Sequence, residues 1–180
     1  MIAALAASVR EHWAQHGQAE RLLMSFHSIP QRNLELGDPY YCHAQKTARL
    51  LAAALELSDT QWSVSFQSRI GRAKWLSPYT DVVIDQLAHQ GLKRLDVICP
   101  GFPTDCLETL EEVALRYGEQ FRAAGGESLR YIPALNARGD HVEALAQLAE
   151  RHLSGWPVTT ARPSPGHDAH IEHRARQLNE

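Results

Sequence analysis

One histidine and three acids are the residues of this sequence best suited to chemistry. His27 directly follows a short apolar run, and Asp105, Glu108 and Glu112 follow another run at spacings of i, i+3 and i+7. An imidazole titrates near neutral pH and binds borderline metals. Mixed nitrogen and oxygen ligands suit a first-row divalent ion such as Fe²⁺. Two or three such ligands would hold the ion loosely, as metal transfer requires, whereas a closed four-ligand site would retain it.

Each of these residues also has a purely structural explanation. The ring of His27 could equally hydrogen-bond a loop carbonyl, and its position alone does not decide between the two roles. Asp105 followed by Glu108 resembles a capping box, and acids in a first helical turn stabilise the helix by about 0.3–1 kcal/mol each. Capping does not explain Glu112 one turn later. The spacing therefore predicts that the three carboxylates line one helical face.

A segment that mixes cations and an aromatic residue follows another apolar run, at residues 67–76. Arg69, Arg72 and Lys74 are interleaved there with other residues and are followed by Trp75. Cations beside an aromatic ring suit an anion with a flat, apolar body. The alternative is a solvated loop in which Trp75 fills part of the core.

Alternating short and long segments must position these residues. Short β-branched or aromatic runs predict strands, and longer segments with helical spacing predict helices. The expected strands are 22–26, 62–66, 95–99 and 129–132, and the expected helices are 2–16, 40–57, 80–90, 106–124 and 140–153. Strands separated by single helices indicate an α/β fold with a four-stranded parallel sheet flanked by helices. Ligands bind beyond the carboxyl ends of such strands, so His27, the cationic loop and the acids are expected at one edge.

The pattern ends near residue 153, so we expect one domain over residues 1–153. Residues 154–180 contain prolines, glycines and three histidines, and are expected to form a mostly disordered tail. Within it, 168–177 could form a short helix. His170 and His173 are spaced to bind a metal adventitiously, although two imidazoles alone make a poor site.

Composition excludes several classes of protein. The 180 residues are 44% hydrophobic and carry a formal net charge of -3, which gives no electrostatic basis for nucleic-acid binding. No apolar stretch approaches the roughly 20 residues that span a bilayer. Three cysteines without paired spacing indicate free thiols in a reducing cytoplasm. We therefore expect a cytoplasmic protein with at most peripheral membrane association, and no motif that predicts an organic cofactor.

Four sequence blocks carry a family resemblance. They are SFHSIP at 25–30 with GDPY at 37–40, FQSRIGRAKWLSPYTD at 66–81, CPGFPTDCLETLEE at 99–112, and YIPALN at 131–136. Their identity, order and separation resemble the carboxyl-terminal half of ferrochelatases, most closely the proteobacterial type. The resemblance implies a Rossmann-like chelatase half-domain of an enzyme that inserts Fe²⁺, its substrate metal, into protoporphyrin IX to form protohaem.

The resemblance also implies roles for individual residues. His27 matches the histidine that binds the iron or accepts pyrrole protons, and Glu108 matches the second iron-binding position. Asp105 matches an acid of the same site, and Glu112 continues the acidic line that in the family carries protons or metal. Trp75 and Tyr79 match aromatic residues near the macrocycle, and Ile29 is also expected on the porphyrin side of the site. Apart from the resemblance, we interpret Arg69, Arg72 and Lys74 as candidates for propionate contacts.

The resemblance covers only the second of two similar halves between which this family binds porphyrin. We therefore expect the chain to pair with an amino-terminal half or with a second copy, and to bind porphyrin weakly alone. An exposed apolar face and self-association should result. Two alternatives remain: a homodimeric single-domain tetrapyrrole chelatase for cobalt or nickel, and a non-catalytic tetrapyrrole-binding module.

Overall fold

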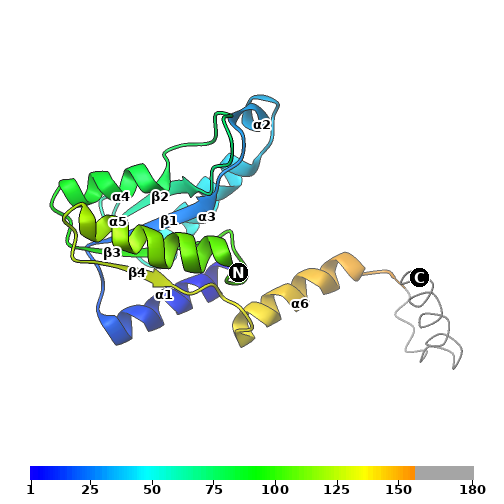
Figure 1. The fold of residues 1–180 in the computed structure, drawn as a ribbon. Helices are drawn as coiled ribbons and strands as arrows, with labels where there is room; N and C mark the ends of the chain where they lie inside the picture. The colour runs from blue at the N-terminus through cyan, green and yellow to red at the C-terminus, as the bar shows by residue number, and fades with distance from the viewer. Residues whose placement is uncertain (157–180) are drawn as a thin grey trace, which may run out of the picture. The chain divides into compact units, whose positions relative to one another are not determined.

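The computed structural model describes residues 1–156 of the chain, and helices alternate with strands along them (Figure 1). The elements are α1 (Ile2–His16), β1 (Arg21–His27), α2 (Gln31–Glu35), α3 (Tyr40–Ala54), β2 (Trp62–Gln67), α4 (Thr80–His89), β3 (Arg94–Ile98), the π-helix η1 (Glu108–Tyr117), α5 (Gly118–Ala123), β4 (Ser128–Ile132) and α6 (Gly139–Leu153).

The four strands form one parallel sheet in the order β2-β1-β3-β4. This confirms the predicted α/β class. Because all four strands run the same way, their carboxyl ends lie at a single edge. β1 and β3 are the central strands, so the segments that follow them, with His27 and the three acids, are neighbours at the middle of that edge.

Helices cover both faces of the sheet. α1 and α3 pack on the face to which Leu22, Met24 and Phe26 of β1 point. α4, η1 and α5 pack on the opposite face, against Leu23 and its neighbours. Side chains alternate along a strand, so His27 points to the same face as Leu23. This is the face that η1 covers.

Two local features differ from the expectation. The segment predicted as one helix over 106–124 is a π-helix, η1, that continues into α5. A π-helix forms i→i+5 hydrogen bonds, and such turns are frequent at functional sites. The short α2 was not expected, and it follows Pro30, its N-cap, at the carboxyl edge of the sheet.

Contacts divide the chain into a unit of residues 1–145 and a unit of residues 146–180, with the boundary inside α6. The expected domain end at residue 153 stays a prediction. From residue 157 on, the expected tail lies outside the described residues, together with His170, His173 and the possible helix at 168–177.

None of the helices within residues 1–156 combines the length and the apolar composition that crossing a membrane requires.

Candidate functional site

The segments that follow β1 and β2 are tied together at the carboxyl edge of the sheet. The backbone N–H of Ser28 donates to the carbonyl of Gln67 over 2.8 Å, and the Ser28 hydroxyl donates to the carbonyl of Leu76 over 3.0 Å. Leu76 in turn donates from its backbone to Ile29 over 2.9 Å. These bonds fix the loop after β2 beside the end of β1, where His27 lies.

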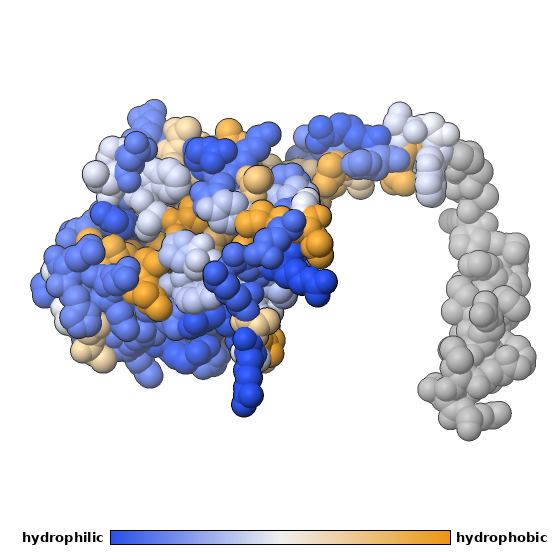
Figure 2. All heavy atoms as spheres, turned by 90° about the horizontal axis from the view of Figure 1, so that it is seen from above, coloured by the Kyte–Doolittle hydropathy of each residue, from blue (hydrophilic) through white to orange (hydrophobic). Residues whose placement is uncertain are grey.

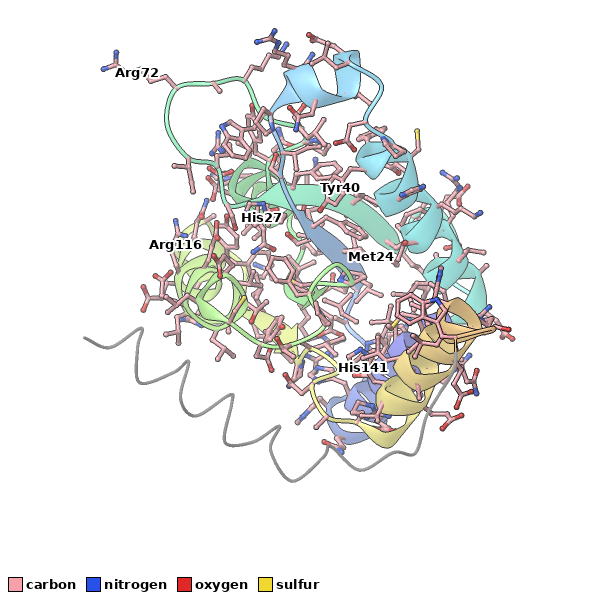
Figure 3. All side chains as sticks on the ribbon, turned by 90° about the vertical axis from the view of Figure 1, so that its right-hand side faces the viewer. Met24, His27, Tyr40, Arg72, Arg116 and His141 are labelled. Carbon is pink, nitrogen blue, oxygen red and sulfur yellow. The ribbon has the colours of Figure 1, made fainter. Side chains whose placement is uncertain are left out.

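His27 presents one free ring nitrogen at this edge. Its Nδ1 lies 2.6 Å from the carbonyl oxygen of Ser28. A carbonyl only accepts, so in the neutral ring Nδ1 carries the proton and Nε2 keeps its lone pair. The hydroxyl of Tyr40 donates to the His27 carbonyl over 2.7 Å (Figure 3). The ring of Phe102 lies 6.2 Å from the imidazole. The geometry leaves Nε2 able to accept a proton or bind a metal.

Glu108 is the first residue of η1, which follows β3 at the same carboxyl edge as His27. A hydrogen bond from the thiol of Cys106 is the main cause that lowers the pKa of the Glu108 carboxyl. The carboxylate is therefore ionised at neutral pH. The structure thus places the two residues predicted to bind the metal at one edge of the sheet, and their metal binding stays a prediction.

Asp105 points toward β4, away from Glu112. Its carboxylate accepts hydrogen bonds from the hydroxyl of Tyr131 (2.8 Å), the side-chain amide of Asn136 (2.7 Å) and the backbone of Ala134 (3.2 Å). Burial raises the pKa of Asp105, but these bonds outweigh it, and the net shift is downward. The carboxylate thus anchors the loop after β3 to the segment after β4.

Glu112 points toward β2, the outer strand on the other side of the sheet from β4. Its carboxylate accepts hydrogen bonds from the backbone N–H (3.1 Å) and hydroxyl (2.6 Å) of Ser68 and from the hydroxyl of Tyr117 (2.6 Å). The guanidinium of Arg116 lies 3.3 Å away. Ser68 has a φ of 65°, a strained conformation for a residue other than glycine, which these bonds help to maintain.

The expected single line of carboxylates is therefore wrong in its geometry. Asp105 precedes η1 and bonds to the segment after β4, whereas Glu112 bonds to the residue after β2, and these two strands are the outer ones of the sheet. The expected capping box is also wrong, because Leu107, not Asp105, is the N-cap residue of η1. Glu108 does lie in the first turn of η1, where the helix macrodipole favours an acid.

The residues predicted to face porphyrin lie in the loops beside His27. Pro30 forms an isolated antiparallel bridge with Trp75, which places Ile29 next to the 74–76 segment. The Trp75 indole donates to the carbonyl of Ile70 over 3.0 Å. The structure places these residues at the carboxyl edge of the sheet, and their contact with porphyrin stays a prediction.

Arg69 is engaged within the protein. Its guanidinium forms an ion pair with Asp81 and lies 3.9 Å from the ring centroid of Tyr79. Tyr79 also donates from its hydroxyl to the carbonyl of Trp75 over 3.2 Å. Arg72 projects outward from the same loop (Figure 3) and forms no ion pair within the described part of the chain. Arg72 is thus freer than Arg69 to meet an anionic group.

Sequence reasoning missed Gln67, Tyr40 and Phe102, each of which supports the site from a different segment. Tyr40 and Phe102 contact His27, and Gln67 contacts Glu108. For Gln67, the one available signal was its place directly after an apolar strand, where ligand-side residues occur. Nothing in the sequence pairs the other two with His27.

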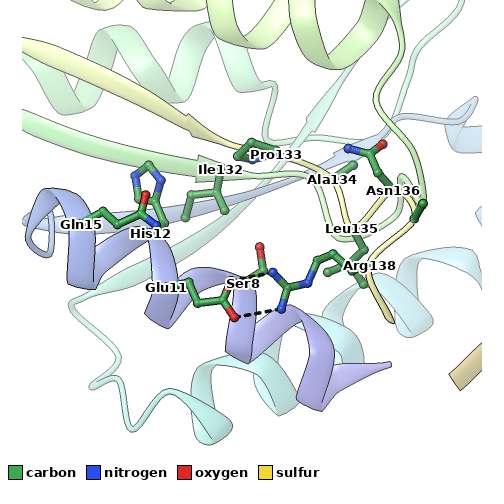
Figure 4. Close-up of a pocket in the computed structure, with 11 residues that line it drawn as sticks. Ser8, Glu11, His12, Gln15, Ile132, Pro133, Ala134, Leu135, Asn136 and Arg138 are labelled. Carbon is green, nitrogen blue, oxygen red and sulfur yellow. Dashed lines mark hydrogen bonds and ion pairs between the residues drawn. The ribbon is translucent and has the colours of Figure 1, made fainter. Parts of the chain in front are cut away.

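The described residues form no cluster of three or more His, Cys, Asp or Glu side chains arranged to hold a metal ion. A separate hollow of about 310 Å³ lies between α1 and the segment after β4, and Glu11, His12 and Arg138 line it (Figure 4). It contains none of the predicted site residues. The carboxyl edge carries His27 and Glu108, and a metal site formed by them stays a prediction.

The fold defines an α/β protein with a histidine and a glutamate at the carboxyl edge of its parallel sheet, and comparison with known proteins gives its family. A ferrochelatase family profile matches residues 1–153. The ferrochelatase of Methylibium petroleiphilum is 54% identical over 98% of this chain and 48% of its own length. That of Nitrosococcus oceani is 55% identical over 85% of this chain and 42% of its own. The solved structure of a putative cobalamin biosynthesis protein from Marinobacter aquaeolei has a TM-score of 0.49 at 13% identity, over 74% of this chain and 97% of that one.

The chain belongs to the ferrochelatase family. It spans about half the length of the curated relatives that it matches.

Proposed function

We propose that the chain is the carboxyl-terminal part of a ferrochelatase, in which it takes part in inserting Fe²⁺ into protoporphyrin IX to form protohaem. Family membership supports the class of reaction. The observation that carries the proposal is that His27, with its Nε2 free, and the ionised Glu108 both lie at the carboxyl edge of the sheet.

The two residues would divide the chemistry between them. Metal insertion requires two pyrrole protons to leave while Fe²⁺ exchanges its water ligands for porphyrin nitrogens. The lone pair on Nε2 of His27 can accept a pyrrole proton. The carboxylate of Glu108 can bind Fe²⁺ as it loses water, since a carboxylate beside histidine ligands is a known setting for ferrous ion. Glu112, held by Ser68, Tyr117 and Arg116, would pass protons onward.

The proposal extends to partners and location. The porphyrin would bind over Ile29, Trp75 and Tyr79, and its other side would be covered by an amino-terminal half, as the greater length of the relatives suggests. A second copy of the chain is the alternative cover. A cytoplasmic location agrees with the three free cysteines, Cys42, Cys99 and Cys106, because thiols persist in reducing compartments.

The test is an insertion assay with Fe²⁺ or Zn²⁺ and protoporphyrin. The chain is assayed alone and mixed with the separately expressed amino-terminal part of the Methylibium relative. We expect activity on mixing, and its loss by at least 100-fold in His27→Ala, because proton transfer by a positioned side chain is worth about 10²–10⁴-fold. Activity of the chain alone would instead indicate a homodimer, and metal preference would then be measured.

A second histidine provides the matched control. His89 is exposed at the end of α4, and its ring bonds the carbonyl of Asp85 at 2.7 Å. It lies at the amino edge of the sheet, so His89→Ala should keep the activity of the unmodified chain. Retained metal insertion by a folded His27→Ala variant would contradict the proposed role of His27.

A further inference from the structure

Gln67 is a buried polar residue that lies between the two residues proposed to handle the metal. Its side chain is 1% exposed, and it pairs with His27 in the parallel register of β1 and β2. Its amide nitrogen donates to the backbone carbonyl of Glu108 over 2.7 Å. A single side chain thus connects the neighbourhood of His27 with the first residue of the helix that carries Glu108.

The surroundings fix the orientation of this amide. The Glu108 carbonyl only accepts, so the nitrogen of Gln67 must face it. The amide oxygen faces the hydroxyl of Ser25 at 2.6 Å and the thiol of Cys99 at 3.3 Å, both of which can donate. Ser25 and Cys99 are themselves buried, on β1 and directly after β3. Three neighbouring strands therefore hold the side chain in one rotamer.

At the beginning of η1, this contact is a direct hydrogen bond between the helix backbone and the sheet. Its N-cap residue, Leu107, is exposed and makes no side-chain capping bond. Cys106 interacts with the Glu108 side chain, and Thr109 bonds back to residues 105 and 106. Gln67 joins the backbone of Glu108 to the sheet itself.

We infer that Gln67 is a positioning residue that sets the separation of the His27 imidazole and the Glu108 carboxylate, and thereby the affinity of the site for a divalent metal. The inference rests on the proposed function of those two residues. Gln67 does not bind the metal, because its amide oxygen and nitrogen are both bonded to protein groups. Loss of groups that orient metal ligands typically weakens metal affinity about 10–100-fold.

The test is titration of the full chain with Co²⁺, a spectroscopic substitute for Fe²⁺ whose visible absorption reports the geometry of its ligands. Gln67→Met keeps the length of the side chain and removes its hydrogen bonds. We expect this variant to bind Co²⁺ on the order of tenfold more weakly and with an altered spectrum. Ser25→Ala frees only the amide oxygen and should give a smaller loss in the same direction.

Ser65→Ala is the matched control. Ser65 is a buried serine of the same polar network, where it accepts a hydrogen bond from Thr80 over 2.9 Å and does not bond to Gln67. Its removal should leave the Co²⁺ affinity and spectrum unchanged. Far-ultraviolet circular dichroism checks that each variant folds.

The outcomes separate the inference from the proposed function. Unchanged Co²⁺ binding in both His27→Ala and Glu108→Gln would reject the site itself. Weakened binding in those two, with unchanged affinity and spectrum in Gln67→Met, would reject the inference alone. If Gln67→Met fails to fold, Ser25→Ala decides, and an unaltered spectrum in that variant would overturn the positioning role. Equal losses in Ser65→Ala would also overturn it, because the effect would then not be specific to Gln67.

Discussion

At the scale of single residues, the three acids that follow β3 lie in three different environments. Glu108 lies at the carboxyl edge together with His27, Asp105 accepts hydrogen bonds from β4 and the segment after it, and Glu112 is held by Ser68 and Tyr117. An acid that already accepts several hydrogen bonds gains little from a metal, since those bonds must first be lost. The geometry therefore favours Glu108 as the metal ligand and Asp105 as an anchor.

Asp105→Asn tests this assignment through pH. The folded pKa of Asp105 is lowered, so its ionised form stabilises the fold above its unfolded pKa of about 3.9, and this stabilisation is lost as the pH falls through the folded value. In Asp105→Asn, the side-chain NH₂ group would replace a carboxylate oxygen that accepts hydrogen bonds, so at least one neighbouring donor would lose its acceptor. We expect the free energy of unfolding to fall by roughly 1–3 kcal/mol at pH 7.

Urea unfolding at several pH values measures this effect. The difference between Asp105→Asn and the unmodified chain should shrink as the pH falls through the lowered folded pKa of Asp105, below which both carry a neutral group. The same variant should keep most of its Co²⁺ affinity, unlike Glu108→Gln. A large loss of metal binding at full stability would instead identify Asp105 as a ligand.

At the scale of elements, the strands were predictable and the kind of helix was not. The apolar runs at 22–26 and 95–99 lie within a residue or two of β1 and β3, because β-branched and aromatic residues bounded by turns are a local signal. In η1, the apolar residues Val113 and Tyr117 are four apart, a spacing compatible with α- and π-helices alike. The spacing of apolar residues alone could not distinguish a π-helix from an α-helix.

The carboxyl edge was predictable because topology alone places strand ends together. The partners of Asp105 were not, because Tyr131 and Asn136 lie 26 and 31 positions away and no local pattern links them. Gln67 is a similar case, since its contact with Glu108 spans 41 positions. Long-range hydrogen bonds of this kind require the folded geometry.

Arg130 joins three elements on the face that α1 covers. Its guanidinium forms two bonds with Asp96 of β3, at 2.7 and 3.0 Å, and donates to the carbonyls of His16 and Gly17 at the end of α1. The Asp96 side chain also accepts from the indole of Trp13 over 2.7 Å and is almost fully buried. The pair therefore fixes α1 to β3 and β4.

Arg130→Met should lower the free energy of unfolding by about 3 kcal/mol, because it leaves a buried carboxylate without its counter-charge. The double variant Asp96→Asn/Arg130→Met should recover part of this loss. Denaturant unfolding measures both. A loss below about 1 kcal/mol in the single variant would show that Asp96 is satisfied by its remaining donors.

The turn before β4 depends on one glycine. A Cβ at Gly126 would lie 2.2 Å from a ring carbon of Phe121, which is fully buried in the core between α5 and the sheet. Gly126→Ala should therefore cost about 1–3 kcal/mol through overpacking. Gly139→Ala is the control, since a Cβ there meets no atom within 4 Å. Equal unfolding midpoints in urea for the two variants would contradict the close contact.

At the scale of the molecule, apolar side chains gather at the edge that carries the site. Leu36, Ile70 and Leu107 follow β1, β2 and β3, and they are 74%, 73% and 78% exposed. Isolated exposed leucines are common, but three on adjacent loops at one edge are the pattern of an interaction surface. Figure 2 shows how apolar residues are distributed among the hydrophilic ones on one face of the protein.

We expect these three residues to drive self-association of the chain when nothing else covers the edge. The variant Leu36→Ser/Ile70→Ser/Leu107→Ser should stay monomeric at concentrations at which the unmodified chain sediments faster. Leu115→Ser is the control, because Leu115 is also exposed, at 63%, but lies near the other end of η1. Sedimentation velocity over a range of concentrations measures the difference. Addition of the amino-terminal part of the Methylibium relative should suppress self-association as effectively as the triple substitution. The partner would cover the apolar surface that the substitutions replace with polar groups.

A chain that remains monomeric at every concentration would show that this edge needs no cover.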